Sequence, residues 1–173
     1  RPPRSTLFPY TTLFRSIDYT NMQYRVRREA IINKVPTPFK VVRQGKRIIS
    51  AFPDPDHPKH VDYEGHFGGK PVAFDAKGTE SETSFRLSNI KEHQMRFLND
   101  WQEGGGVSFF LIEFTKHRKI YCVPFEEVRK RWEIAEQGGR KSIPYRDFRL
   151  EWEAGPGRGM PLDYLYTVKA VML

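Results

Sequence analysis

The chain has 173 residues, of which 38% are hydrophobic and 29% charged, so it is long enough for one domain with a buried core and too short for two. Its single cysteine, Cys122, excludes an intramolecular disulfide and a cysteine-rich zinc module, and it favours a reducing cytoplasm. The longest apolar run falls far short of the roughly 20 residues that a transmembrane helix needs. A net charge of +8 favours nucleic acid or another polyanion as the partner.

The opening segment, residues 1–16, differs from the rest of the chain. It has no initiator methionine, no acidic residue and no helical or strand period, and it looks like the translation of sequencing-adapter read-through. We therefore expect it to be foreign, to lie outside the fold and to stand in place of the native N-terminus. Without its three arginines the net charge is +5, so the basic character weakens but remains.

The first half of the remaining chain alternates between helical and strand patterns. Apolar side chains recur at three- and four-residue spacing from Tyr19 to Ile31 and predict a helix over residues 17–34, which Pro36 ends. Two β-rich runs around Gln44-Gly45 predict a hairpin over residues 39–52. The cations near its tip are Arg43, Lys46 and Arg47. Residues 59–77 predict a second hairpin, with a short strand, a glycine-rich turn and a strand from Pro71 to Lys77.

The second half completes an α/β pattern. A helix is predicted from Asn89 to Gln102, with Asn89 and Glu92 as a capping box and three glycines as the stop. Residues 107–114 form a strand apolar enough to be buried on both faces. A strand at 119–123, a helix at 124–137 and an apolar tail at 162–173 follow. This order of elements predicts an α/β layer fold with a mixed sheet.

The strand from Pro71 to Lys77 carries the candidate site. Strand alternation places Asp75 and Lys77 on one face, and a hairpin would bring Asp62 from the preceding strand beside Asp75. Two carboxylates suit a hard cation such as Mg²⁺, and a lysine can offset charge on a phosphate. An Asp-x-Lys pair alone is more often a surface salt bridge, because short motifs match freely.

Gln94 supports the site because it falls on the apolar stripe of the helix predicted from Asn89. An inward-facing amide needs partners, and it is either a satisfied core amide or a residue that reaches the metal or its water. The polar run of residues 79–84 is either a solvated loop or a phosphate-binding loop with Thr79, Thr83 and Ser84 as contacts. Asp54 and Asp56 lie in a proline-stiffened link, and we expect them to be outside the site.

Taken together, several motifs resemble the RecU-type Holliday junction resolvases, a family of the PD-(D/E)xK nuclease superfamily. Those nearest the site are Asp62-Tyr63-Glu64-Gly65, the strand Val72–Lys77, Thr83-Ser84-Phe85 and His93-Gln94. Those outside it are Thr20-Asn21 with Tyr24, Lys34–Pro38 and Gly139–Ile143. The resemblance spans most of residues 17–173. The chain departs from the family's pattern at Asp75, where Glu is usual, at His60, where a hydroxyl residue is usual, and at the link that replaces part of the stalk.

The resemblance implies a restriction-endonuclease-like α/β fold, in which a mixed sheet is flanked by helices and a β-hairpin stalk protrudes at about residues 39–58. It implies one nuclease domain over residues 17–173, with Asp62, Asp75 and Gln94 at the metal and Lys77 as the transition-state stabiliser. Mg²⁺ is the expected cofactor and Mn²⁺ the alternative. The stalk cations Arg43, Lys46 and Arg47 would probe the centre of the junction.

The same resemblance implies a cytoplasmic homodimer that acts on branched DNA in recombination and repair, with a strand-exchange recombinase as a further partner and no membrane. Two alternatives remain open. One is a nuclease of the same fold without junction selectivity, and the other is a non-catalytic module that binds DNA or a recombinase.

Overall fold

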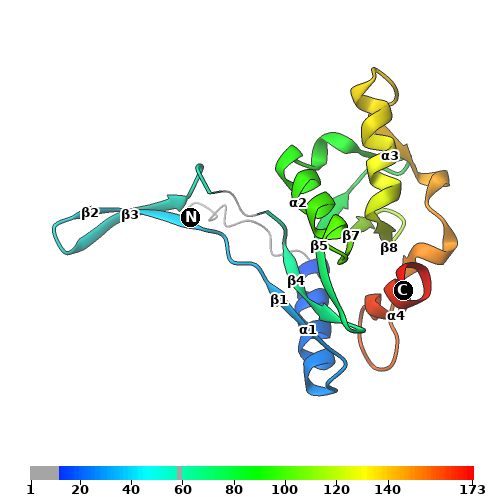
Figure 1. The fold of residues 1–173 in the computed structure, drawn as a ribbon, viewed down its shortest axis with the longest axis horizontal. Coiled ribbons are helices and arrows are strands. Elements are labelled where there is room, and N and C mark those ends of the chain that lie inside the picture. The colour runs from blue at the N-terminus through cyan, green and yellow to red at the C-terminus, as the bar shows by residue number, and fades with distance from the viewer. Residues whose placement is uncertain (1–11, 58–59) are drawn as a thin grey trace, which may run out of the picture.

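A six-stranded mixed sheet forms the centre of the protein, described here from a computed structural model over residues 12–57 and 60–173 (Figure 1). Its strand order is β1-β4-β5-β7-β8-β10. The bounds are β1 (Ala30–Lys34), β4 (Tyr63–Phe67), β5 (Lys70–Thr79), β7 (Val107–Phe114), β8 (Lys119–Pro124) and β10 (Glu153–Ala154). Neighbouring strands are antiparallel except β5 and β7, which are parallel. The predicted mixed sheet is confirmed.

Four helices cover the two faces of the sheet: α1 (Thr12–Val26), α2 (Glu92–Glu103), α3 (Phe125–Glu136) and α4 (Tyr164–Met172). Strand β5 shows the division, because Val72, Phe74 and Ala76 pack with α1 and α4 while Ala73 packs with α2 and α3. The side chains of β7 are buried on both faces, as its continuous apolar run predicts. The fold therefore has three layers, with the sheet between two pairs of helices.

The predicted helix over residues 17–34 is wrong at both ends. The helix begins at Thr12, Leu13 is 2% exposed within the core, and the chain leaves the helix at Val26. Arg28 then adopts a left-handed φ of 59°, and residues 30–34 form the edge strand β1 against β4. Residues 12–16 thus belong to α1, whereas residues 1–11 lie outside the described residues. The foreign origin of the segment remains a prediction.

The hairpin predicted at residues 39–52 is a separate two-stranded ribbon that projects from the body of the protein (Figure 1). It consists of β2 (Phe39–Gln44) and β3 (Arg47–Pro53), joined by a turn in which Gly45 has a φ of +59°. Large apolar side chains on both strands are exposed, namely Phe39, Val41, Val42, Ile48, Ile49 and Phe52. We call this ribbon the stalk.

Buried polar contacts join α1 to α4. The Tyr24 hydroxyl donates to Asp163 Oδ1 at 2.8 Å and accepts from the Leu165 backbone N–H at 3.1 Å. The Tyr164 hydroxyl donates to Asn21 Oδ1. The Asn21 and Tyr24 motif of the sequence is therefore structural, since both side chains are buried where the two helices meet.

Smaller elements close the fold. Strands β6 (Ser84–Arg86) and β9 (Ser142–Pro144) form a second two-stranded ribbon beside the sheet. Short 3₁₀ turns occupy Leu87–Asn89, Tyr145–Asp147 and Leu150–Trp152. Among the described residues, none of the helices has the length and apolar character to cross a membrane.

Candidate metal and nuclease site

The β4–β5 hairpin brings the two predicted carboxylates together. Tyr63, the first residue of β4, pairs with Phe74 of the antiparallel strand β5. Asp62, just before β4, therefore lies beside Asp75, which follows Phe74 on β5. The turn that joins the strands is at Gly68 and Gly69, while Gly65 lies within β4. A Cβ on Gly65 would come within 1.9 Å of the Ile31 carbonyl oxygen on β1, so only glycine fits there.

Lys77 lies on the same face of β5 as Asp75, as strand alternation predicts. Its Nζ is 2.7 Å from Asp75 Oδ2, and its side chain is 18% exposed. The Asp75 side chain is fully buried, and Asp62 is 8% exposed. Asp62 Oδ2 accepts a hydrogen bond from the Ala76 backbone N–H at 3.0 Å, which fixes the first carboxylate against the neighbouring strand. These three side chains form a group that opens toward solvent at Lys77.

Gln94 reaches this group from the first turn of α2. Its Nε2 donates to Asp75 Oδ1 at 3.1 Å, and its Oε1 accepts from the Lys91 backbone N–H at 3.0 Å. Gln94 thus caps the helix and holds a carboxylate, and its amide is satisfied. The cap predicted at Asn89 is wrong, because residues 87–89 form a 3₁₀ turn and Lys91 precedes the helix.

Burial is the main electrostatic feature of the site. The pKa of Asp75 is raised from 3.8 to about 7, mainly by burial and also by the nearby Asp62 carboxylate, while the Lys77 ammonium acts in the opposite direction. Two close carboxylates with one lysine leave an excess of negative charge in a poorly solvated place. A cation bound between the carboxylates would stabilise their charged forms.

The donor set fits a hard divalent cation. Asp62 and Asp75 supply carboxylate oxygens, which are the ligands that Mg²⁺ and Mn²⁺ prefer. Gln94 does not present an oxygen, because its Oε1 is used in the helix cap and its Nε2 faces Asp75. Within residues 12–57 and 60–173 there is no cluster of three or more His, Cys, Asp and Glu side chains able to hold a metal. Two protein carboxylates with water in the remaining positions is an arrangement typical of Mg²⁺.

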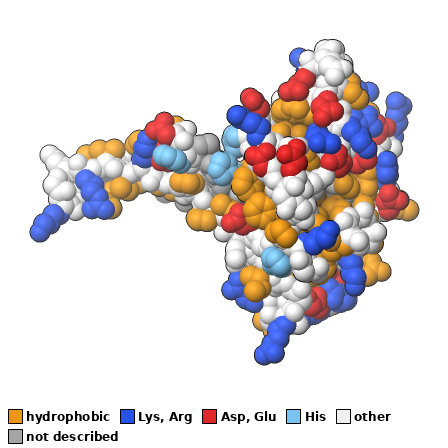
Figure 2. Space-filling view, in the orientation of Figure 1, with side chains coloured by type: hydrophobic (Ala, Val, Ile, Leu, Met, Phe, Trp, Pro, Cys, Tyr) orange, Lys and Arg blue, Asp and Glu red, His pale blue; other side chains and the backbone are white. Residues whose placement is uncertain are grey.

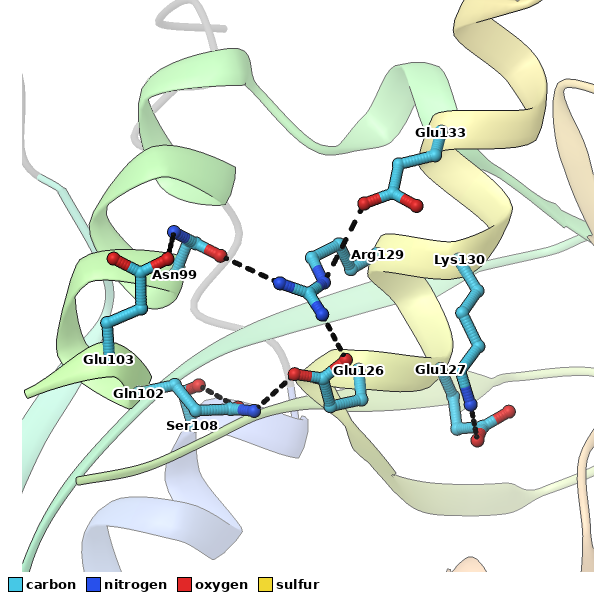
Figure 3. Close-up of polar contacts among 9 residues, drawn as sticks. All are labelled: Asn99, Gln102, Glu103, Ser108, Glu126, Glu127, Arg129, Lys130 and Glu133. Carbon is cyan, nitrogen blue, oxygen red and sulfur yellow. Dashed lines mark hydrogen bonds and ion pairs between the residues drawn. The ribbon is translucent and has the colours of Figure 1, made fainter. Parts of the chain in front are cut away.

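Helix α2 is held rigidly against α3 at its far end (Figure 3). Gln102 Nε2 donates to Glu126 Oε1 at 2.6 Å, and Arg129 Nη2 donates to Glu126 Oε2 at 2.7 Å. The Ser108 hydroxyl on β7 donates to Gln102 Oε1 at 3.0 Å. This network fixes the helix whose first turn carries Gln94, so it supports the site from a distance.

The other predicted contact residues lie in two places. Arg43, Lys46 and Arg47 are exposed on the stalk, whose end carries Lys and Arg side chains (Figure 2). Thr79, Thr83 and Ser84 lie in the segment that follows Lys77. Ser81, which sequence reasoning did not single out, organises that segment because its hydroxyl accepts from the backbone N–H groups of residues 83 and 84 at 3.3 and 3.2 Å.

The carboxylates of the proline link have different partners. Asp54 and Asp56 both pair with Lys40, and Asp54 Oδ2 is 3.0 Å from His57 Nδ1. These contacts fasten the link to the stalk. His60 is exposed and stacks on Phe97 of α2 with ring centroids 5.1 Å apart.

The arrangement of an antiparallel hairpin with two carboxylates and a lysine, beside a helix on a mixed sheet, defines a protein of the PD-(D/E)xK nuclease class. The family model "Recombination protein U", RecU, matches residues 11–170. The chain belongs to the RecU family.

Curated relatives agree with this assignment. The "Holliday junction resolvase RecU" of Pediococcus pentosaceus is 34% identical over 154 residues, covering 84% of this chain and 77% of the relative. The protein of the same name from Oenococcus oeni is 34% identical over 160 residues, covering 88% and 80%. The solved Holliday junction resolvase Hjc of Archaeoglobus fulgidus aligns with a TM-score of 0.40 at 10% identity over 65% of this chain and 77% of that one, too low a likeness to bear on the fold.

Proposed function

We propose that the protein is a divalent-metal-dependent endonuclease that resolves four-way DNA junctions, with Mg²⁺ as the metal. The observation that carries this proposal is the group of Asp62, Asp75 and Lys77 on one hairpin of a RecU-family chain. The name of the curated relatives, Holliday junction resolvase, supports the substrate.

Asp62 and Asp75 would hold the metal, which when bound supplies an activated water and neutralises charge on the phosphate. Lys77 Nζ lies 2.7 Å from Asp75 Oδ2, so its ammonium would lie close to a phosphate held beside the two carboxylates. The ammonium then offsets the charge that develops as water attacks in line. Gln94 keeps the Asp75 carboxylate in place through its 3.1 Å hydrogen bond.

Junction selectivity is assigned to the stalk. A ribbon with Arg43, Lys46 and Arg47 near its tip can enter the open centre of a four-way junction, where strands of all arms are close together. The loop with Thr79, Thr83 and Ser84 follows Lys77 directly and offers hydroxyls and backbone amides to a phosphate.

Resolution requires two symmetric cuts, and we propose a homodimer in which each copy supplies one site. The exposed apolar side chains of the stalk support this, because an isolated two-stranded ribbon is marginal in water and gains stability when covered. As part of the same proposal, a protein that acts on recombination intermediates would work in the cytoplasm, with a strand-exchange recombinase as a further partner.

The test is a labelled synthetic junction incubated with and without Mg²⁺, beside a linear duplex with the sequence of one arm. We expect paired symmetric nicks in the junction, only with metal, and little cutting of the duplex. Substitution of Arg43, Lys46 and Arg47 by Ala should remove this preference and leave the metal requirement. Equal cutting of duplex by the unaltered protein would favour a nuclease without junction selectivity, and binding without cutting would favour a non-catalytic module.

A further inference from the structure

The turn between β7 and β8, residues 115–118, lies directly beside the segment that follows Lys77. The Thr115 backbone N–H and hydroxyl both donate to the Thr79 carbonyl oxygen, at 3.0 and 3.1 Å. Strands β5 and β7 are parallel and in register up to Thr79 and Phe114, so both segments emerge at the same end of the sheet. In open α/β sheets ligands bind at the carboxyl ends of the strands, and Lys77 lies toward that end of β5, two residues before Thr79.

His117 fastens this turn to the segment after Thr79. Its Nε2 lies 2.8 Å from the Glu82 carbonyl oxygen, and because that oxygen can only accept, the imidazole is the donor. The ring stacks on Tyr145 with centroids 3.8 Å apart and planes inclined by 5°. The Tyr145 backbone N–H in turn donates to the Thr83 carbonyl oxygen at 2.8 Å. Three segments distant in sequence therefore form one fixed edge.

The cations of this edge lack acidic partners. Lys116 and Arg118 are exposed, and no ion pair joins either of them to another described residue. Other exposed cations of the body, such as Arg28 and Lys169, also have no ion pair with a described residue, so what distinguishes Lys116 and Arg118 is their place on the edge beside the segment that follows Lys77. Glu80 and Glu82 are exposed on the same edge, so this edge is not a continuous basic surface. A phosphate would be bound by the individual side chains of Lys116 and Arg118.

We propose that this turn is a second DNA-backbone contact, at which Lys116 and Arg118 bind phosphates of the duplex arm that leads away from the cutting site. The proposal rests on the proposed function for its substrate. It differs from the stalk contact in position and in what it recognises, because phosphates at the end of the sheet belong to an ordinary duplex arm and not to the junction centre. Loss of this contact should therefore weaken junction and linear duplex alike.

The experiment measures the salt dependence of binding in EDTA, where no cleavage occurs, by fluorescence anisotropy with a labelled junction and a labelled duplex. The variant is Lys116→Gln with Arg118→Asn, since Arg118 has a φ of 53° and asparagine tolerates that conformation. The matched control is Lys70→Gln with Lys169→Gln, which removes the same charge from the opposite end of β5 and from α4.

We expect the slope of log K against log salt to become shallower by about 0.9 per lost contact, and affinity near 0.1 M salt to fall by about tenfold per contact, for both DNAs. The control should keep the slope of the unaltered protein. The proposal is overturned if the variant and the control give the same slope, or if only junction binding weakens. Failure of the unaltered protein to cut a junction would remove the proposed function and leave this binding result standing.

Discussion

Asparagine at position 75 should stabilise the metal-free protein at high pH, although it removes one of the two carboxylates that we propose hold the metal. Burial raises the pKa of Asp75 to about 7 from its ordinary value of 3.8. The folded protein therefore holds a proton that the unfolded chain releases, and the stability this gives is present below about pH 4 and lost as pH rises through about 7. The difference between these two pKa values corresponds to about 4 kcal/mol at most.

Asp75→Asn keeps the size of the side chain and removes this titration. Between about pH 5 and about pH 8 the free energy of unfolding of the variant should therefore gain about 3 kcal/mol relative to the unaltered protein. For a chain of this length that is roughly 6–12 °C in melting temperature. The measurement is thermal unfolding in EDTA at both pH values, with Asp100→Asn on the exposed side of α2 as the isosteric control.

Mg²⁺ supplies the second half of the test. At about pH 8 the metal should raise the melting temperature of the unaltered protein, because it binds the folded state alone, and should leave Asp75→Asn unchanged. A difference between variant and unaltered protein that is the same at both pH values would refute the argument, since it would show that the pKa of Asp75 is not raised on folding. A variant that Mg²⁺ still stabilises would show that Asp75 is not a ligand.

Four further substitutions separate catalysis from folding. Lys77→Met should lower junction cleavage by orders of magnitude while Mg²⁺ binding and junction affinity persist, and Asp56→Asn should leave the cleavage rate unchanged. Leu13→Ala should lower the free energy of unfolding by about 2–5 kcal/mol in a denaturant titration, because Leu13 is buried in the core, and a neutral result would place residues 12–16 outside the fold. Tyr24→Phe should cost about 1–3 kcal/mol in the same titration, since it leaves a buried carboxylate short of a donor.

The site was predictable because strand geometry is local. Alternation along β5 places Asp75 and Lys77 on one face, and a hairpin with a turn at two glycines brings Asp62 opposite, whatever the rest of the sheet does. The strand at residues 107–114 was equally clear, because an apolar run of that length between glycines and a basic turn has few alternatives.

The helix predicted over residues 17–34 failed for a tertiary reason. The pattern of Ala30, Ile31 and Ile32 is compatible with either a helix or a strand. These residues form a strand because they pair with β4. Arg28 adopts a left-handed backbone conformation that arginine does not favour, so the sequence does not predict that the helix ends there. The sequence predicts only an apolar tail at residues 162–173, because α4 is apolar on most of its surface and its helical period is weak.

For Gln94 the sequence pattern predicts that the amide is buried, but not which of its atoms faces Asp75. Its place on an apolar stripe predicts an inward amide with partners, and the structure supplies both of them. The Lys91 backbone N–H at the start of the helix donates to Gln94 Oε1, so the other amide atom of Gln94, Nε2, faces the Asp75 carboxylate. In this structure the helix cap therefore leaves Gln94 Nε2, and not Oε1, facing the Asp75 carboxylate.

The parallel pair β5 and β7 explains why these features meet. A parallel connection needs a crossover, and α2 supplies it, so the first turn of α2 lies at the carboxyl end of β5. The partial positive charge of a helix N-terminus there favours a carboxylate or a phosphate. The same crossover returns the chain along β7 and delivers the turn with Lys116 to that end. The helix cap beside Asp75 and the proposed second DNA contact therefore follow from one topological feature, and a change in the β5–β7 register should disturb cleavage and duplex binding together.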